Sequence, residues 1–308
     1  TDALALIKKD NPFPAVCGRV CNKRCEEACT RATLDEAVAI DDVKRFIAQK
    51  DLDSKTRYIP KKVIPSNRGE FKNKIAIIGG GPAGLSCAYY LALTGYRPTV
   101  FEKNEKPGGM LTYGIPSYKL EKDVVEEEID IIRALGVEIK CGVEVGKDIT
   151  LDELRKDGYE AFYIAIGCQG SRKSGVAGED ADGVMSAVDI LHEIAENHDL
   201  DLKGNKTVVI GGGNVAVDVA RSTKRCGADV LGMFCLESRE EMPASEEEIF
   251  ETEDEGIQIN NGWGVKEILA ENGKVTGVVL KKCTSVKDAD GKFNPQYDDC
   301  LLYTSPSP

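Results

Sequence analysis

The sequence predicts an α/β protein with two strand–helix–strand units, preceded by a small helical, cysteine-rich domain. Each α/β unit is predicted by a glycine turn that stands between a short apolar run and a helix. Four cysteines at a constant spacing near the N-terminus set the helical domain apart from the rest. We therefore divide the chain into three parts, residues 1–70, 71–202 and 203–308.

Length and charge limit the classes of protein to which this chain can belong. Its 308 residues suffice for about two domains, each with a buried core. A net charge of −12 argues against nucleic acid or an anionic membrane surface as a partner. No apolar run approaches the ~18–20 residues of a membrane span and no signal peptide opens the chain, so we expect a cytoplasmic protein. Because the first residue is Thr1 and not methionine, we also expect a fragment.

The first α/β unit, Lys74–Lys103, has the order of parts that binds a dinucleotide. Strand, glycine turn, helix and second strand follow one another: Ile75–Ile78, the G-x-G-x-x-G of Gly79, Gly81 and Gly84, Leu85–Ala92 with Gly95 at its end, and Thr99–Phe101. The glycines permit a tight turn, close approach of a pyrophosphate and close packing of helix on strand. Glu102 follows Gly84 by 18 residues (102 − 84), where a carboxylate accepts hydrogen bonds from an adenosine ribose. The sequence thus predicts a Rossmann-like dinucleotide site and not an ordinary glycine-rich turn.

The run CGRVCNKRCEEAC repeats cysteine every four residues. Its members are Cys17, Cys21, Cys25 and Cys29. On a helix this spacing keeps the thiols on one side, and in a loop it lets them converge on a metal. Thiolates suit iron–sulfur clusters, and Arg19, Lys23 and Arg24 offset the negative charge of a thiolate-ligated cluster. Zinc and a buried cysteine-rich helix face are the alternatives. We expect a helix over residues 35–51 beside this site, then a polar link over 54–73.

The stretch after the first unit carries glycines that suit a planar ligand. Gly108, Gly109 and Gly114 let the backbone approach a flat ring, while Pro107 and Pro116 stiffen it. Each of these glycines is alternatively a simple turn.

Further elements are predicted between this stretch and the second unit. We expect a helix over 119–135, strands over 137–139 and 143–145, and a short helix capped by Thr150. A buried strand over 161–167 ends in a glycine, at the edge where α/β sheets bind ligands.

The second α/β unit begins at Lys206 and repeats the pattern of the first. Gly211, Gly213 and Ala216 fill G-x-G-x-x-A after an apolar strand, and Gly227 closes the helix that follows. Its second strand is predicted over 230–234. Beyond it we expect one capped helix and one hairpin: a Ser245/Glu248 capping box with Gly256 at the helix end, and a turn at Asn272–Gly273.

Three motifs together resemble one family. NPFPAVCGRVCNKRCEEAC, GGGPAG with Glu102, and KPGGMLTYGIPSYKLEKDVV are similar to the glutamate synthase small-subunit family of FAD- and NAD(P)H-dependent iron–sulfur oxidoreductases, which includes the electron-input half of dihydropyrimidine dehydrogenase. The resemblance implies a disulfide-reductase-like two-domain flavoprotein behind a helical iron–sulfur domain that is incomplete at its N-terminus. It also implies that the second half of the FAD domain is absent from this fragment.

The resemblance implies three sets of site residues and no catalytic side chain. FAD contacts are expected at Gly79, Gly81, Pro82, Ala83, Gly84, Glu102, Lys103, Gly109, Met110, Leu111, Ile115, Pro116, Val143 and Gly167. Contacts to a nicotinamide nucleotide are expected at Gly211, Gly213, Asn214, Val215, Ala216, Glu237 and Arg239. The family carries two 4Fe-4S clusters, which implies that Cys17, Cys21 and Cys25 serve one and Cys29 the other.

The activity implied is that of an oxidoreductase which passes hydride from NAD(P)H to FAD and electrons through 4Fe-4S clusters to a partner subunit or an electron-carrier protein. Because both nucleotide pockets are already assigned, we expect the acceptor to be a protein and the assembly to be a hetero-oligomer. The alternative is a non-catalytic assembly module of a larger oxidoreductase complex. A disulfide reductase fits less well, because outside the N-terminal run no two cysteines form C-x-x-C.

The choice of nicotinamide nucleotide is predicted from the residues after the second strand. NADPH-using relatives place two adjacent arginines where this chain has Leu236 and Glu237. Glu237 follows Ala216 by 21 residues (237 − 216), close to the ~20-residue interval at which an acid bonds the ribose 2′-hydroxyl of NAD. A carboxylate there repels a 2′-phosphate, which predicts NADH over NADPH. The alternatives are that Arg239 turns toward the phosphate, or that Glu237 is a solvated surface group.

Overall fold

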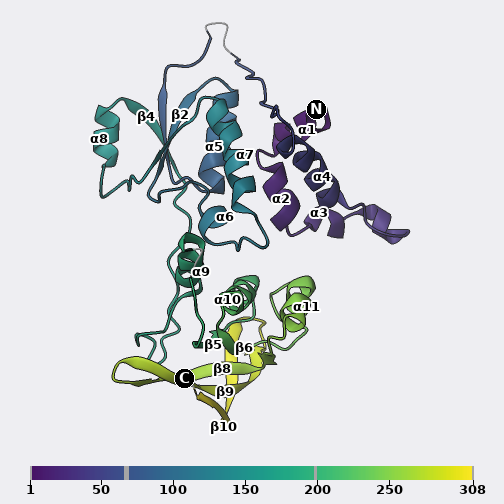
Figure 1. The fold of residues 1–308 in the computed structure, drawn as a ribbon, viewed down its shortest axis with the longest axis vertical. Helices are drawn as coiled ribbons and strands as arrows, with labels where there is room; N and C mark the ends of the chain where they lie inside the picture. Colours follow the sequence, from purple (N-terminus) through teal and green to yellow (C-terminus); the bar gives the residue numbers. More distant parts are fainter. Residues whose placement is uncertain (1, 66–68, 198–199, 307–308) are drawn as a thin grey trace. The chain divides into compact units, whose positions relative to one another are not determined.

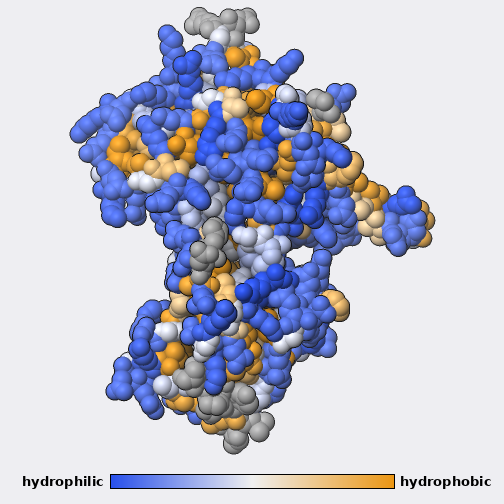
Figure 2. Space-filling view, viewed as in Figure 1, coloured by the Kyte–Doolittle hydropathy of each residue, from blue (hydrophilic) through white to orange (hydrophobic). Residues whose placement is uncertain are grey.

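The computed structural model describes residues 2–65, 69–197 and 200–306. They fall into two compact units that divide between Cys168 and Gln169. Each unit contains a parallel sheet, and the second also contains an antiparallel one (Figure 1). Hydrophilic side chains cover most of the visible surface (Figure 2), in keeping with a chain of which 30% is charged. None of the described helices is long and apolar enough to cross a membrane.

The first unit is built on a four-stranded parallel sheet in the order β3-β2-β1-β4. Its strands are β1 Lys74–Ile78, β2 Arg97–Glu102, β3 Glu138–Cys141 and β4 Tyr159–Ile164. Helices α5 (Pro82–Leu93) and α7 (Lys122–Ala134) lie on one side of the sheet, and α8 (Leu151–Lys156) lies on the other (Figure 1). Ile77 and Val100 are fully buried under α5 and α7, whereas Ala76 faces the α8 side with Leu154. The predicted first α/β unit is thereby confirmed.

The N-terminal helices belong to this same unit. They are α1 Asp2–Asp10, α2 Pro14–Val20, α3 Arg24–Glu27, the 3₁₀ helix η1 Thr30–Thr33 and α4 Ile40–Leu52. Phe13, Ala15 and Val16 are buried in the core that α5 and α7 also form. A fully buried ion pair, Lys8 Nζ to Glu128 Oε1 at 3.0 Å, fixes α1 to α7. Because a buried charge that loses its partner is costly, this contact disfavours separation of α1 from α7.

The second unit combines two three-stranded sheets. The parallel sheet has the order β5-β6-β7, from Lys206–Ile210, Asp229–Cys235 and Ile259–Asn261. The antiparallel sheet has the order β10-β9-β8, from Trp263–Glu271 (β8), Lys274–Lys287 (β9) and Phe293–Pro306 (β10). Its helices are α9 Ala187–Glu196, α10 Asn214–Arg225 and α11 Glu246–Asp254. The predicted hairpin is confirmed, since Asn272 (φ 52°) and Gly273 (φ 81°) form the turn between β8 and β9.

Several predicted elements differ from the structure. The helix expected over 35–51 begins at Ile40, because Asp35 instead pairs with Arg31 and accepts the Glu36 N–H. Residues 143–145 form no strand, since glycines at positive φ on either side break the extended backbone. The strand expected to be buried over 161–167 is β4, an edge strand, and Ile164 is 56% exposed. Elsewhere element types were predicted correctly, and Thr150 caps α8 as expected. Of the Ser245/Glu248 capping box, the structure shows the bond from Glu248 N–H to Ser245 Oγ at 3.4 Å.

Candidate functional site

Two glycines of the first loop lie so close to neighbouring backbone atoms that they leave no room for a side chain. Gly79 has φ of +106°, and a Cβ added to it would lie 2.3 Å from the carbonyl oxygen of Ala165. A Cβ on Gly84 would lie 2.0 Å from the carbonyl oxygen of Gly79. Neither position accepts another residue without movement of the backbone. The close packing of helix on strand that the sequence predicted is therefore present.

Glu102 is fixed at the end of β2 by two backbone N–H groups. Gly80 N–H donates to Oε2 at 2.7 Å and Asn104 N–H donates to Oε1 at 2.9 Å. The residue is 5% exposed, and the N–H of Val143 donates to its backbone carbonyl at 2.9 Å. A carboxylate has about four lone-pair sites, so two bonds leave room for hydroxyl donors. Gly80 was missed by sequence reasoning, although it is the middle glycine of the three that open GGGPAG.

The turn after Pro107 lies against the glycine loop. Gly108 N–H donates to the Gly80 carbonyl at 2.7 Å, and Gly109 (φ +55°) approaches Gly81 so closely that a Cβ would lie 2.9 Å from its Cα. The short helix α6 (Met110–Tyr113) follows, with Leu111 buried. The structure therefore brings this predicted flavin-facing segment to the first glycine loop.

Other predicted residues surround this edge of the sheet. Pro82, Ala83 and Lys103 are exposed. Gly167 lies two residues beyond Ala165, whose N–H donates to the Ile78 carbonyl at 2.8 Å. Its φ is +68°, and a Cβ added there would meet no atom within 4 Å.

The second glycine loop is more open. Gly211 has φ of +136°, and a Cβ on it would lie 3.2 Å from that of Ala216. A Cβ on Gly213 would meet nothing within 4 Å. Asn214 Oδ1 accepts the Ser245 N–H at 3.0 Å, which fixes the start of α11 beside the loop, and Val215 is 52% exposed.

Glu237, the carboxylate predicted for the second unit, does not occupy the strand position that Glu102 has in the first. Ile210 pairs with Phe234 as Ile78 pairs with Phe101, so Cys235 occupies the place that Glu102 has in the first unit. Burial raises the pKa of the Cys235 thiol to about 11, so it stays neutral. Glu237, two residues on, reaches back: its Oε2 would lie 3.1 Å from a Cβ on Gly212.

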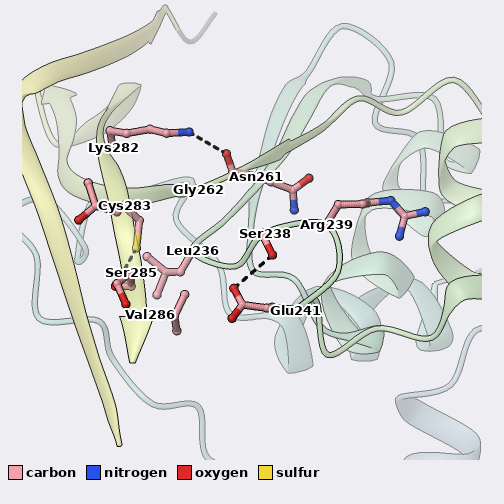
Figure 3. Close-up of a pocket in the computed structure, with 11 residues that line it drawn as sticks. Leu236, Ser238, Arg239, Glu241, Asn261, Gly262, Lys282, Cys283, Ser285 and Val286 are labelled. Atoms are coloured by element: carbon pink, nitrogen blue, oxygen red, sulfur yellow. Dashed lines mark hydrogen bonds between the residues drawn. The ribbon is translucent and has the colours of Figure 1, made fainter. Parts of the chain in front are cut away.

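A pocket of about 310 Å³ opens between the loop after β6 and strand β9 (Figure 3). Lys282 on its far wall donates from Nζ to the Asn261 carbonyl at 3.2 Å. Arg239 points away from β9 and pairs with Glu246 at 3.2 Å and Glu253 at 3.7 Å on α11. The alternative in which Arg239 turns toward a nucleotide phosphate is not the arrangement of the side chain in this structure.

The cysteine run lies on three short elements and not on one helix. Cys17 is on α2, Cys21 ends it, Cys25 is in α3 and Cys29 precedes η1. Cys21 and Cys25 are exposed, which argues against a buried cysteine-rich face. In the described part of the chain, no three His, Cys, Asp or Glu side chains are grouped to hold a metal ion.

Local electrostatics nevertheless differ along the run. Backbone N–H groups, first that of Val38 and then that of Arg31, lower the pKa of the Cys29 thiol below its ordinary value. Burial raises the pKa of Cys17. Arg19, which the sequence suggested would offset cluster charge, instead bonds Glu121 at 2.6 Å. The backbone around Cys29 therefore favours its thiolate, the form of cysteine that binds metals.

The chain matches two protein-family models. Residues 73–293 match the family described as pyridine nucleotide-disulphide oxidoreductase, and residues 1–56 match dihydropyrimidine dehydrogenase domain II, 4Fe-4S cluster. The chain is 39% identical to NADP(+)-dependent formate dehydrogenase subunit beta of Moorella thermoacetica, over 96% of this chain and 44% of that protein. It is 35% identical to the glutamate synthase [NADPH] small chain of Escherichia coli K12, over 94% and 63%.

Solved structures show the same fold. FprA of Mycobacterium tuberculosis in complex with NADPH gives a TM-score of 0.64 at 20% identity, over 76% of this chain and 69% of that one. Thioredoxin reductase of Lactococcus lactis gives 0.52 at 22%, over 73% and 75%. The chain spans 44% and 63% of the two relatives above, about half their length. The resemblance to the glutamate synthase small-subunit family is confirmed, and the chain belongs to the pyridine nucleotide-disulphide oxidoreductase family, with a 4Fe-4S domain of the dihydropyrimidine dehydrogenase type at its N-terminus.

Proposed function

We propose that the protein is an NAD(P)H-dependent oxidoreductase that accepts hydride on FAD and passes electrons through 4Fe-4S clusters to a partner protein. The observation that carries this proposal is the presence, in one chain, of two glycine loops that each have a carboxylate within reach. Two such loops call for two dinucleotides. The match of residues 1–56 to a 4Fe-4S domain supports iron–sulfur clusters as the groups that accept electrons from the flavin.

We assign FAD to the first loop because its residues are held before any ligand binds. The start of α5 presents backbone N–H groups and a positive dipole end to a pyrophosphate. Glu102 is oriented for a ribose by Gly80 and Asn104. When bound, a flavin converts two-electron hydride chemistry into single-electron transfers, so the protein needs to supply placement and charge only.

The cysteine run is proposed to hold the clusters, with Cys29 one ligand and Cys17, Cys21 and Cys25 the others. In its support, the Cys29 thiol is biased toward the thiolate by backbone N–H groups. Both compared relatives are named as a subunit or a chain, which favours a hetero-oligomer. Leu34, five residues after Cys29, and Phe46 on α4 are exposed at 88% and 63%, and such apolar side chains suit cover by another polypeptide.

The test is cofactor analysis of the full-length protein purified without oxygen. We expect a flavin absorbance spectrum that bleaches on addition of NAD(P)H, together with iron and acid-labile sulfide. A protein with zinc but no iron would contradict the cluster assignment. A protein with no flavin would instead support the alternative, a non-catalytic assembly module.

We further propose that NADH is preferred, although the relatives described above are named for NADP(H). Glu237 lies over the middle glycine of the second loop, where it can accept a bond from a ribose 2′-hydroxyl and repel a 2′-phosphate. Arg239, the nearest cation in sequence, is turned to α11. We expect kcat/KM to be higher for NADH, and Glu237→Ala to shift the ratio toward NADPH by about tenfold or more.

Glu240→Ala is the matched control, because Glu240 is an exposed carboxylate three residues away. Steady-state reduction of an artificial acceptor measures the ratio. Equal or better kcat/KM with NADPH in the unmodified protein would refute the preference. An unchanged ratio in Glu237→Ala would show that Glu237 does not set it.

A further inference from the structure

Lys122, the first residue of α7, extends its side chain to the turn beside the first glycine loop. Its Nζ donates to the carbonyl of Leu111 at 3.0 Å and to the carbonyl of Ile115. Leu111 is buried, and Gly108 at the start of the same turn donates its N–H to the Gly80 carbonyl. One ammonium group therefore ties α7 to the segment that contacts the first dinucleotide loop.

The ammonium group of Lys122 contacts two carbonyl oxygens and, in the described part of the chain, no carboxylate. Among the described residues no ion pair includes Lys122, whereas the buried cations Lys8 and Arg221 pair with Glu128 and with Glu251 and Glu255. Its position at the N-terminus of α7 adds the positive end of the helix dipole. Burial lowers the pKa of Lys122 to about 8, so the group is still mostly protonated near neutral pH.

Lys122 is half-buried. A cation that is partly removed from water without a counter-ion is costly, and such groups concentrate at functional sites. A bound flavin would gain one negative charge when it accepted a hydride from a nicotinamide. A fixed positive charge near its ring system favours the reduced state without any movement at the time of reaction. The turn held by Lys122 is the segment that the proposed function sets along the flavin.

On the basis of that proposed function, we infer that Lys122 is the positioning residue of the flavin site, which holds the Met110–Ile115 turn and supplies the positive charge that stabilises the reduced flavin. Two effects follow, one on the affinity of the protein for FAD and one on the chemistry of bound FAD. A purely structural lysine would affect the first and leave the second unchanged.

The test measures the midpoint potential of bound FAD and the dissociation constant of its sulfite adduct, which is also anionic. Lys122→Gln and Lys122→Met remove the charge, Lys122→Arg retains it, and Lys147→Gln is the control on an exposed lysine. All are measured in the full-length holoenzyme with excess added FAD. We expect the Lys122→Gln and Lys122→Met variants to have a more negative midpoint potential of FAD and to bind sulfite about tenfold more weakly. The Lys122→Arg variant and the control should have the potential and sulfite affinity of the unmodified protein.

The outcomes separate this inference from the function on which it rests. If Gln and Met bind FAD with unchanged potential and sulfite affinity, the inference is wrong and the FAD assignment stands. If they bind no FAD at saturation while Arg does, the positioning role is supported. If the Arg variant shows the same loss as Gln, charge is not what Lys122 supplies. An unmodified protein that binds no FAD contradicts the proposed function itself.

Discussion

The two glycine loops have the same strand–turn–helix plan but differ in how tightly they are built. In the first loop, Cβ atoms on Gly79 or Gly84 would collide with backbone, and Glu102 is buried. In the second, Ala216 replaces the third glycine and Gly213 has open space. Glu237 is only half-buried and lies beyond the strand end. The difference fits a first site that retains its cofactor and a second that admits and releases a nucleotide at each turnover.

The largest effect expected from this comparison comes from adding one methyl group to each loop. Gly84→Ala places a Cβ 2.0 Å from the Gly79 carbonyl oxygen, so we expect the free energy of unfolding to fall by about 1–3 kcal/mol or more, with loss of FAD. Gly213→Ala adds its Cβ in open space at φ −95°, so stability should change by less than about 0.5 kcal/mol while KM for the nicotinamide nucleotide rises. Urea unfolding and steady-state kinetics measure both. An equal loss of unfolding free energy in the two variants would show that the two loops do not differ in tightness.

The two carboxylates provide a second pair of variants. In Glu102→Gln one backbone N–H, of Gly80 or Asn104, loses its acceptor, and an unsatisfied buried donor costs about 1–3 kcal/mol. Glu237→Gln should leave the urea midpoint unchanged and act on nucleotide choice alone. If Glu237→Gln proved as destabilising as Glu102→Gln, the second acid would be a structural residue.

A third prediction concerns iron content. Cys29→Ser should lower the iron bound per protein by about half, the share of one cluster of two. Cys226→Ser, a half-buried cysteine at the end of α10, is the control and should retain all of it. Iron and sulfide assays after anaerobic purification give the answer. Full iron in Cys29→Ser would remove that residue from the ligand set.

The smallest effect is a difference in thiol reactivity in protein stripped of metal. Backbone N–H groups lower the pKa of Cys29, so it becomes a thiolate at lower pH than an ordinary cysteine. Burial raises the pKa of Cys17, so its thiolate forms only at higher pH. Iodoacetamide labelling at a series of pH values, followed by mass spectrometry, measures this difference. We expect the labelling midpoint of Cys29 to lie at a lower pH than that of Cys17. The reverse order would show that the backbone around Cys29 does not favour the thiolate.

Sequence alone predicted the elements whose causes are local. Glycine spacing, the Thr150 helix cap and the Asn272–Gly273 turn depend on neighbouring residues, and the structure contains all of them. The exposure of β4 depends on its edge place in the sheet, which the apolar run over 161–167 does not encode. The partner of Arg19 could not be predicted from the sequence either, because Glu121 lies 102 positions away in the chain.

The candidate site was predicted to a similar degree. Gly79, Gly84 and Glu102 stand together as expected, because a βαβ unit imposes that geometry. Counting residues made Glu237 the counterpart of Glu102, but the strand register gives that place to Cys235. Lys122 was missed, since a lysine at a helix start carries no signal until its two carbonyl partners are known.

The central claim is that the first loop holds a resident flavin and the second an exchangeable nucleotide whose electrons reach the clusters. Gel filtration of the full-length protein, followed by anaerobic stopped-flow mixing with NADH and freeze-quench EPR, tests it most directly. We predict that FAD stays bound through gel filtration while nucleotide is lost, and that flavin bleaching precedes the EPR signal of reduced 4Fe-4S clusters. Cluster reduction without flavin, or flavin bleaching with no cluster signal after complete reduction, would contradict it.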